Sequence, residues 1–288
     1  MRNSLYAPTA RFDTSRGMTE DEIFKIAPAI FAREAHESRS DRFVPVPTIE
    51  VLRGLKKEGF DVVGVKQSNT RDETKRNFTK HLIRLRRVDG ENYKVGDTVA
   101  EMLLKNANDG TCNYELMAGL FRILCLNSLV AQKAEIEAIK VRHSGNHKDT
   151  ISKVIEGTFR VVDEAELALS APMEWSQIKL NQDEKQVFAE AVHEIRFGET
   201  ETGARPVIQP LQLLKPRRFE DHGDDLWRVF NVAQEHAIRG GDHGILINER
   251  GQRRRTSTRQ VNGIDQDIRL NKALWSLGEK MAALKKAA

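Results

Sequence analysis

Two kinds of hydrophobic pattern follow one another along the chain. In the segment 47–59, "PTIEVLRGLKKEG", the apolar residues Ile49, Leu52 and Leu55 recur at helical spacing, and Gly59 marks a helix end. The next apolar segments are short and separated by charged connectors, which is typical of strands. They are "FDVVGVKQSN", "KHLIRLRRV" and "TVAEMLLKNAN". The pattern therefore predicts a helix followed by three strands.

Helices are also predicted before and after this region. In "MTEDEIFKIAPAIF", Thr19 and Glu22 have the spacing of a capping box, and Pro28 should interrupt the helix. After the turn "NDGT", the segment "YELMAGLFRILCLNSLV" has few charges and is predicted to form a mostly buried helix. The expected core runs helix, three strands, helix.

The second half of the chain is predicted to be mainly helical. Helical segments are "DTISKVIEGTFRVVDEAELALS", "SQIKLNQDEKQVFAEAVHEIRF" with Asn181 or Ser176 as its cap, "DDLWRVFNVAQEHAIRGG" and "QDIRLNKALWSLGEKMAALKK". "AEIEAIKVRH" suggests one further strand, and "ETETGARPVIQPLQLLKP" a proline-bearing loop. "NERGQRRRTSTRQVNGID" lacks apolar periodicity and is predicted to be a flexible loop.

These elements indicate an α+β fold, in which an antiparallel sheet of three or more strands packs on helices and the C-terminal half is helical. We find no internal repeat and no clear linker. We therefore expect a flexible arm at 1–18 and a single α+β domain at 19–288. Within it, a sheet-bearing core occupies 47–165, and a helical part at 176–288 carries a mobile basic loop at 248–263.

Composition supports a folded protein of the cytoplasm. The chain has 288 residues, of which 39% are hydrophobic, and this is enough for a substantial core. Cys112 and Cys125 fit neither a metal-ligand spacing nor a disulfide framework, as expected in a reducing compartment. The N-terminal segment lacks a signal-peptide pattern, and no apolar window is long enough to span a membrane.

Charge is segregated along the chain. The net charge is only +4, but the segment 53–87 has eleven basic and four acidic residues, a net charge of +7. The segment 250–288 has ten basic and three acidic residues, again +7, which leaves −10 for the remainder. Such segregation produces a basic surface on a nearly balanced protein.

The strand "KHLIRLRRV" carries a candidate binding surface for phosphates. Alternation along a strand places Lys80, Arg84 and Arg86 on one face, and Lys66 and Lys105 in the neighbouring strands could extend the row. Arg71, Lys75 and Arg76 lie in the adjoining connector. The same pattern is also typical of the solvated face of a half-buried sheet.

A second candidate surface lies in "GQRRRTSTRQ". Its arginines are Arg253, Arg254, Arg255 and Arg259. Guanidinium groups bind phosphate in a bidentate manner, and the neighbouring hydroxyls add donors, so the composition suits backbone contact without base readout. A solvated, disordered loop would have the same composition. Aromatic residues are only 6% of the chain, so binding by base stacking is not expected.

The histidines offer a weaker alternative. His143 and His147 are four residues apart, and His222, His236 and His243 follow downstream, which would allow a metal site. No phosphate-loop, dinucleotide-binding, zinc-protease or hydrolase motif is present. We therefore expect no metal, no cofactor and no enzymatic activity.

Five segments of the chain together carry a resemblance to known proteins. They are "AHESRSDRFVPVPTIEVL", "KHLIRLRR", "NDGTCNYELMAGLFRILCLNSLV", "VIEGTF" and "TSTRQVNGIDQDIRLNKALW". These segments resemble the YfjQ/YafZ family of uncharacterised prophage and plasmid proteins. The resemblance extends from about residue 10 to 284. It implies a mobile-element protein of the bacterial cytoplasm, and the family supplies no established activity or site residues.

The order of elements from 47 to 130 is also similar to the core of ring-forming single-strand annealing proteins. In those proteins a basic sheet-and-helix groove holds the DNA backbone. The comparison would place "AGLFRIL" at their basic helix, with Arg122 as the one matching charge. Element order alone is a signal of low specificity, because unrelated α+β domains share it.

These observations lead to one expected function and two alternatives. We expect a mobile-element protein that binds single-stranded DNA, or another nucleic acid, through backbone charge and that promotes annealing as a homo-oligomer. One alternative is an inhibitor of a host defence or restriction system that contacts a host protein through the acidic part of the chain. The other is a metal-dependent nuclease built on His143 and His147.

Overall fold

The protein has an α+β fold. The computed structural model describes residues 16–87, 98–122, 128–129, 139–141, 147–198, 208–247 and 251–287. The chain divides into two compact units, Met1–Ala168 and Leu169–Ala288. This boundary falls between the sheet-bearing core and the helical part expected from the sequence. The expectation that both form a single domain stays a prediction.

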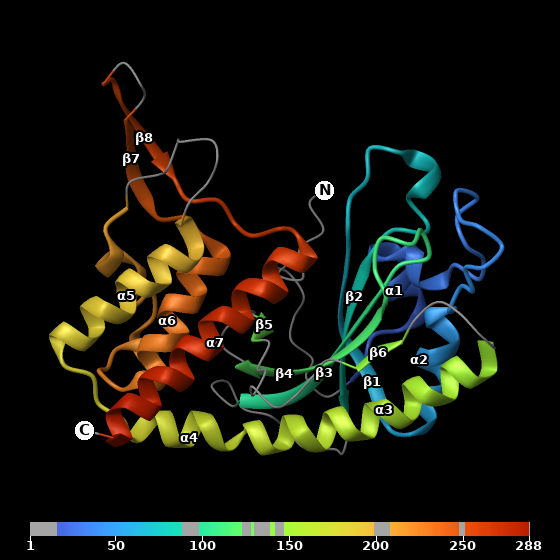
Figure 1. Cartoon of the computed structure of the whole chain (residues 1–288), viewed down its shortest axis with the longest axis horizontal. Helices are drawn as coiled ribbons and strands as arrows, with labels where there is room; N and C mark the ends of the chain where they lie inside the picture. The colour runs from blue at the N-terminus through green and yellow to red at the C-terminus, as the bar shows by residue number, and fades with distance from the viewer. Residues whose placement is uncertain are drawn as a thin grey trace. The chain divides into compact units, whose positions relative to one another are not determined.

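Unit 1 contains a sheet and helices (Figure 1). Its helices are α1 (Glu20–Ile26), η1 (Pro28–Phe31), α2 (Thr48–Lys57), η2 (Glu73–Lys75) and α3 (His147–Ala168). Its strands are β1 (Phe60–Gln67), β2 (His81–Arg87), β3 (Thr98–Asn106), β4 (Tyr114–Arg122), β5 (Ser128–Leu129) and β6 (Ile139–Val141). The sheet is antiparallel in the order β1-β2-β3-β4-β5, and β6 also pairs with β4.

Local signals at the start of unit 1 act as predicted. Thr19 and Glu22 form a reciprocal capping box at α1, and Pro28 begins η1 after α1 has ended. The backbone N–H of Met18 donates to the carbonyl of Val62 in β1 at 2.7 Å. Of the predicted arm at 1–18, residues 1–15 lie outside the described residues.

The prediction of a helix at 114–130 is wrong. Residues Tyr114–Arg122 form β4, which pairs along its length with β3 and accepts β5 and β6 on its other side. A continuous apolar run is compatible with a buried strand as well as a buried helix, and its period cannot distinguish them. Leu116, Met117 and Ala118 are all buried, so both faces of the strand are covered, and such strands lose the clean alternation that marks a sheet with one solvated face.

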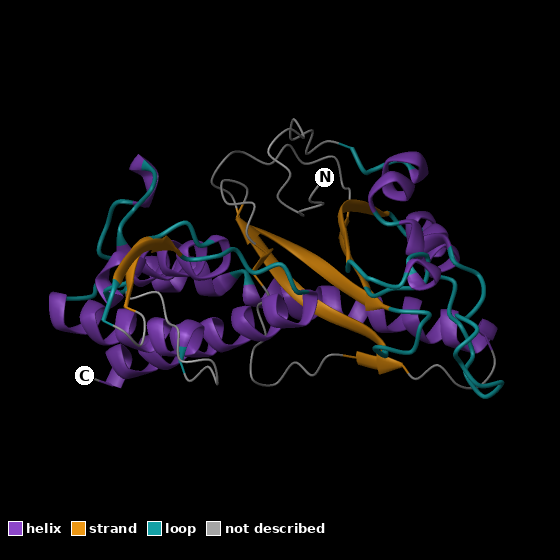
Figure 2. Cartoon of the chain, turned by 90° about the horizontal axis from the view of Figure 1, so that it is seen from above, coloured by secondary structure: helices purple, strands orange, loops and turns teal. Residues whose placement is uncertain are grey.

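One face of the sheet packs against the helices of unit 1. Ile83, Leu104 and Leu116 come from three adjacent strands and are fully buried in this core. Residues of the covering helices in the same core are Ile23, Ile30, Ile49, Leu52, Leu55, Val154 and Val161. Figure 2 shows the long strands beside these helices. Burial of the apolar side chains removes their surface from water and is the main stabilising term of the unit.

Unit 2 is a helical unit with a two-stranded sheet. Its elements are α4 (Ser170–Gln177), α5 (Gln182–Phe197), η3 (Pro210–Leu214), η4 (Phe219–Asp221), α6 (Leu226–Arg239), β7 (His243–Ile247), β8 (Arg253–Ser257) and α7 (Ile264–Ala287). The helix predicted at 176–198 is confirmed as α5 from Gln182 onward, and Asn181 is its cap, in a capping box with Glu184. Ser176, the other predicted cap, lies near the end of the separate helix α4. The other predicted helices of the second half are confirmed as α3, α6 and α7.

An aromatic cluster forms the centre of unit 2. Trp175 lies 4.7 Å from Trp275 and 5.2 Å from Phe230, measured between ring centroids. Gly278 allows α7 to approach this cluster, because a Cβ atom there would lie 2.4 Å from the ring of Trp175. Large aromatic side chains bury much apolar surface, so this cluster fixes the helices that carry the loops of the unit.

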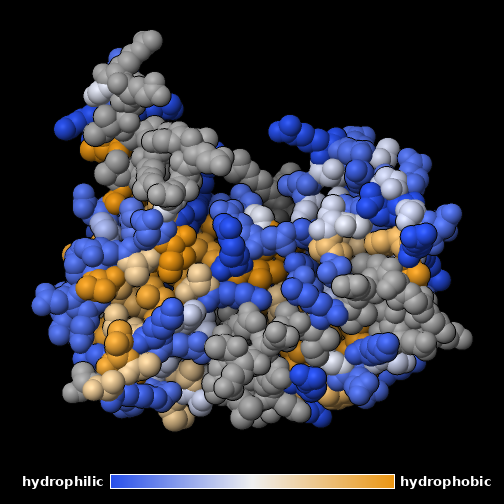
Figure 3. All heavy atoms as spheres, viewed as in Figure 1, coloured by the Kyte–Doolittle hydropathy of each residue, from blue (hydrophilic) through white to orange (hydrophobic). Residues whose placement is uncertain are grey.

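The surface of unit 2 has hydrophobic and hydrophilic parts. In Figure 3, hydrophobic residues gather over the helices, while the described part of the β7–β8 hairpin is mainly hydrophilic. Val187 and Ile195 of α5 are among the exposed apolar residues, at 58% and 37%. Among the described residues, no helix is long and apolar enough to cross a membrane.

Candidate anion-binding site

The basic segment 248–263 contains a strand, contrary to the prediction of a flexible loop. Arg253–Ser257 form β8, which pairs antiparallel with β7 in the register His243 to Ser257 and Ile247 to Arg253. Three consecutive arginines have no hydrophobic alternation of their own, so the sequence of β8 gives no strand signal. The segment forms a strand because its backbone pairs with the apolar segment of β7.

The arginines of β8 are exposed. Arg253, Arg254 and Arg255 all lie on the surface, and the structure records no acidic partner for them among the residues it describes. Alternation along the strand places Arg253 and Arg255 on one face and Arg254 on the other. His243, opposite Ser257, and Ile245, opposite Arg255, share the face of Arg253 and Arg255. This face therefore combines cations with the exposed apolar side chain of Ile245.

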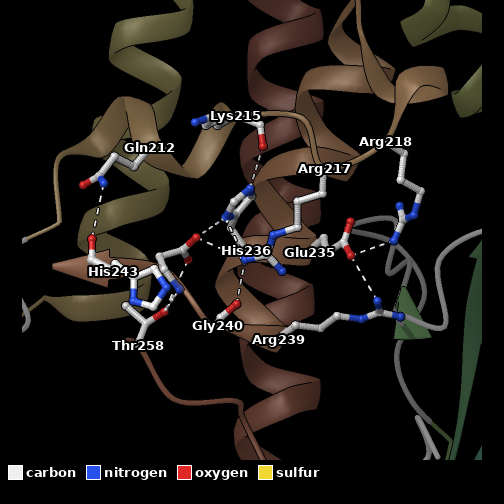
Figure 4. A network of polar contacts seen from close by, with 11 residues as sticks. Gln212, Lys215, Arg217, Arg218, Glu235, His236, Arg239, Gly240, His243 and Thr258 are labelled. Carbon is white, nitrogen blue, oxygen red and sulfur yellow. Dashed lines mark hydrogen bonds and ion pairs between the residues drawn. The ribbon is translucent and has the colours of Figure 1, made fainter. Parts of the chain in front are cut away.

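A pocket of about 440 Å³ lies at the base of the hairpin. Its lining residues are Gln212, Lys215, Pro216, Arg217, His236, Gly240, Gly241, Asp242 and His243. They come from η3 and the segment after it, the C-terminal end of α6 and the start of β7 (Figure 4). Lys215 and His243 are exposed at this pocket, whereas His236 is 4% exposed.

His236 is fixed by a polar contact at each ring nitrogen. Its Nε2 lies 2.8 Å from the carbonyl oxygen of Lys215, and its Nδ1 is in short contact with Oδ1 of Asp242. A carbonyl oxygen can only accept a hydrogen bond, so Nε2 donates to Lys215. Nη2 of Arg217 lies 3.1 Å from the same Nδ1 and also donates to Asp242 at 3.1 Å.

Asp242 is the acidic centre of this cluster. Burial acts to raise the pKa of its carboxyl group, but the hydrogen bond from His236 and the charges of His236 and Arg217 outweigh burial. The net result is a pKa lowered from the usual value of 3.8. Asp242 is therefore ionised at neutral pH and neutralises part of the positive charge around it.

The backbone of the α6–β7 turn holds Asp242 against β8. The N–H of Asp242 donates to Oγ1 of Thr258 at 3.0 Å, and the N–H of Thr258 donates to the carbonyl of Asp242 at 2.9 Å. Gly240 has φ +62°, and a Cβ atom there would lie 2.7 Å from the carbonyl oxygen of Thr258. Glycine is therefore required where the turn crosses this strand.

Further polar contacts hold the C-terminal end of α6 next to the pocket. Arg218 and Arg239 both donate to Oε1 of Glu235 on α6, at 2.6 and 3.0 Å (Figure 4). Arg196 of α5 donates to the carbonyls of Ala237 and Arg259, at 2.7 and 2.9 Å, and burial lowers its pKa. These contacts tie the end of α6 to its surroundings.

The predicted basic row on the sheet of unit 1 is present but buried. The register confirms that Lys66 and Lys105 flank Leu82 of β2, so they extend the row of Arg84 and Arg86. The four cations are between 5% and 9% exposed, so the alternative of a solvated face is wrong.

The buried row is paired with carboxylates. Nε and Nη2 of Arg84 donate to Glu101 at 2.6 and 2.9 Å, and Arg86 donates to the same carboxylate. Lys105 pairs with Glu115 at 2.9 Å. These side chains neutralise charges inside the protein and are not presented to solvent.

The other predicted binding residues are scattered. Arg71 and Arg76 are exposed in the β1–β2 connector, and Lys75 lies 3.9 Å from Asp72. Lys80, just before β2, is partly buried. Arg259 is exposed after β8. Arg122 ends β4, where its backbone pairs with Thr98, and does not lie on a helix.

The structure describes only some of the histidines proposed for a metal site. His143 lies outside the described residues, and His147 is the first residue of α3. Among the residues that the structure describes, no group of three His, Cys, Asp or Glu side chains could hold a metal ion. The alternative of a metal-dependent nuclease thus gains no support from His222, His236 or His243.

Sequence reasoning missed Lys215, Arg217 and Asp242 as site residues. They come from separate segments that meet only in the folded unit. The segment "RGGDHG" carried a usable signal, because two glycines beside an aspartate and a histidine at a helix end are typical of a tight turn with polar side chains.

Comparison with known proteins gives a family. The family model described as "Domain of unknown function (DUF932)" matches residues 35–275. The chain belongs to the DUF932 family. It is 38% identical over 266 residues to the UPF0380 protein YfjQ of Escherichia coli (strain K12), and equally to the UPF0380 protein YafZ of that strain. Each alignment covers 92% of this chain and 92% of the relative, which confirms the resemblance to the YfjQ/YafZ proteins. No solved structure matches this DUF932 chain.

Proposed function

We propose that this DUF932 protein binds single-stranded nucleic acid through the phosphate backbone, with the β7–β8 hairpin as the main contact surface. The observation that carries the proposal is the row Arg253, Arg254 and Arg255, which is exposed on an ordered strand. Exposed guanidinium groups on a strand can contact successive phosphates, and each contact releases counterions from the nucleic acid.

The hairpin face favours a single strand over a duplex. Ile245 is 44% exposed and lies opposite Arg255. An apolar side chain between cations can contact the faces of unpaired bases, which a duplex keeps stacked. The proposal no longer depends on Arg84 and Arg86, because both are buried against Glu101.

The proposed context is that of a mobile-element protein in the bacterial cytoplasm. Binding through phosphates leaves base edges free to pair, so the same surface is compatible with strand annealing by a homo-oligomer. Annealing and oligomerisation are parts of the proposal that depend on binding, and they are tested only after it.

Fluorescence anisotropy tests the proposal with a labelled short single strand and the matching duplex. Titrations run between about 50 and 200 mM salt, where binding that depends on phosphate contacts weakens steeply. We expect the single strand to bind more tightly. The double variant Arg253→Ala with Arg255→Ala should bind at least tenfold more weakly, with a logarithmic salt slope smaller by about 1.4, since each phosphate contact contributes about 0.7.

Arg269→Ala is the matched control, because Arg269 is an exposed arginine of the same unit on α7. Its binding should equal that of the unmodified protein. Equal loss in the control would indicate a nonspecific charge effect. If neither the strand nor the duplex binds at low salt, the nucleic-acid proposal is wrong, and a host protein becomes the partner to test.

A further inference from the structure

The pocket at the base of the β7–β8 hairpin has a positive charge of its own, in addition to the charge of the arginines of β8. It contains Lys215 and Arg217 as cationic groups and Asp242 as its one carboxylate. Two cations and one carboxylate leave a net positive charge around the cavity, beside the fixed ring of His236.

Part of this charge is available to a ligand. Arg217 has a side chain that is 32% exposed, and every contact recorded for it among the described residues uses Nη2. Its Nε and Nη1 remain as donors. Lys215 uses its carbonyl to fix His236, while its exposed ammonium group has no recorded partner in the described part of the chain.

Hydrogen bonds fix the guanidinium group of Arg217 in the pocket. Nη2 of Arg217 donates to the carbonyl of Gly240 at 2.6 Å as well as to Asp242, so the guanidinium group is held at two points. Preorganised donors lose little conformational entropy on binding. A volume of about 440 Å³ is within the range of about 300–1,000 Å³ that is usual for small-molecule sites.

We infer that this pocket is a binding site for a phosphomonoester group, and specifically for the terminal phosphate of a nucleic-acid strand that lies on the hairpin. This inference rests on the proposed function. A phosphomonoester carries about −1.5 to −2 charge at pH 7 and has three acceptor oxygens, whereas a phosphodiester within the strand carries about one charge. A phosphomonoester therefore gains more from the ammonium group of Lys215 and from the remaining donors of Arg217.

The hairpin provides a path to the pocket. His243 lines the pocket and begins β7, and it shares its strand face with the positions of Arg253 and Arg255. Successive phosphates on that face would therefore lead toward the pocket. The strand end would enter the cavity between Lys215 and Arg217.

Strands of one sequence with different ends test the inference. The full chain is titrated with a 5′-phosphorylated, a 3′-phosphorylated and an unphosphorylated single strand, and anisotropy gives each Kd. We expect one phosphorylated strand to bind about tenfold more tightly than the unphosphorylated one, because charge-assisted hydrogen bonds are added. Lys215→Gln and Arg217→Gln should remove this preference.

Lys280→Gln is the matched control, since Lys280 is exposed on α7 without a recorded partner in the described residues. It should keep the preference. Lys215→Gln is the decisive variant if Arg217→Gln fails to fold, because the Lys215 ammonium group supports no recorded contact. Equal binding of all three strands by the unmodified protein would overturn the inference and leave the proposed function standing.

Absence of binding to any strand would instead overturn the proposed function and, with it, the strand end as ligand. Titration calorimetry with a nucleoside monophosphate and with inorganic phosphate then tests whether the pocket binds a phosphate group without a strand. Binding that is lost in Lys215→Gln would support the pocket as a phosphomonoester site for a small molecule. No heat with either ligand overturns the site altogether.

Discussion

The arginines of β2 and β8 illustrate two uses of the same residue on a strand. Arg84 and Arg86 are 9% and 7% exposed and share the carboxylate of Glu101. Arg253 and Arg255 have the same spacing, but they are exposed and have no recorded acidic partner in the described residues. The position of a carboxylate on the neighbouring strand separates an arginine that stabilises the interior from one that is available to a partner.

The pocket of unit 2 has an intermediate arrangement. Asp242 is 8% exposed and, like Glu101, contacts two basic side chains, here those of His236 and Arg217. One side of this cluster opens into a cavity, whereas the cluster around Glu101 is closed. The three sites therefore form a series from closed to open, and the cost of losing a charge should fall along it.

The largest effect is expected for Glu101→Gln. It neutralises the buried carboxylate that Arg84 and Arg86 share, and removal of one partner from a buried ion pair costs about 3–5 kcal/mol. Urea unfolding followed by far-UV circular dichroism measures the loss. Tryptophan fluorescence follows unit 2 separately, because Trp175, Trp227 and Trp275 all lie there.

Glu20→Gln is the control for this variant. Glu20 pairs with Arg53 at 2.7 Å on the surface, where both side chains are about half exposed. Exposed ion pairs contribute little to stability. If Glu101→Gln shifts the unfolding midpoint no more than Glu20→Gln does, the buried pairs do not have the role described for them.

Asp242→Asn should have the next largest effect, about 1–3 kcal/mol, because it replaces the charged acceptor of His236 and Arg217 by a neutral amide at a buried position. The effect should depend on pH. Since the folded-state pKa of Asp242 is lowered from 3.8, its contribution is present above that value and is lost as the pH falls through the folded-state pKa.

Urea unfolding followed by tryptophan fluorescence at neutral and acidic pH checks this expectation. The difference between the protein and Asp242→Asn should shrink at the acidic end. Asp183→Asn, which changes an exposed carboxylate of α5, should show a much smaller difference at neutral pH. A difference for Asp242→Asn that grows on acidification would contradict the lowered pKa.

Much of the fold could be predicted because its signals are local. The capping pairs Thr19 with Glu22 and Asn181 with Glu184 lie three residues apart and mark their helix starts correctly. Strands β1 to β3 were recognisable from short apolar segments between charged connectors. β4 was predicted as a helix because its continuous apolar run, which includes Gly119, has no decisive period.

The site could not be predicted to the same extent, because its decisive contacts are distant in sequence. Glu101 lies 17 residues from Arg84, and only the register of β2 with β3 brings them together. Nothing in the spacing of Arg84 and Arg86 distinguishes them from Arg253 and Arg255. The carboxylate that partners an arginine row is a tertiary property of the chain.

Arg84→Lys should have a smaller effect, about 1–2 kcal/mol, because it retains the positive charge but removes the bidentate contact with Glu101. Circular dichroism during urea unfolding again provides the measurement. Arg76→Lys is the control, since Arg76 is exposed in the connector of the same unit. Indistinguishable midpoints for the two variants would show that charge alone holds Glu101.

The smallest effect on stability is expected at the open end of the series. Replacement of Arg253 and Arg255 by alanine removes exposed side chains without recorded partners in the described residues, and such surface changes usually alter stability by less than about 0.5 kcal/mol. Tryptophan fluorescence during urea unfolding should give the same midpoint as the unmodified protein.

Arg254→Ala, on the opposite face of β8, should also leave the midpoint unchanged but should weaken strand binding less than the double variant. A large loss of stability in the double variant would mean that these arginines support the hairpin, and any loss of binding could then not be assigned to contact with phosphate.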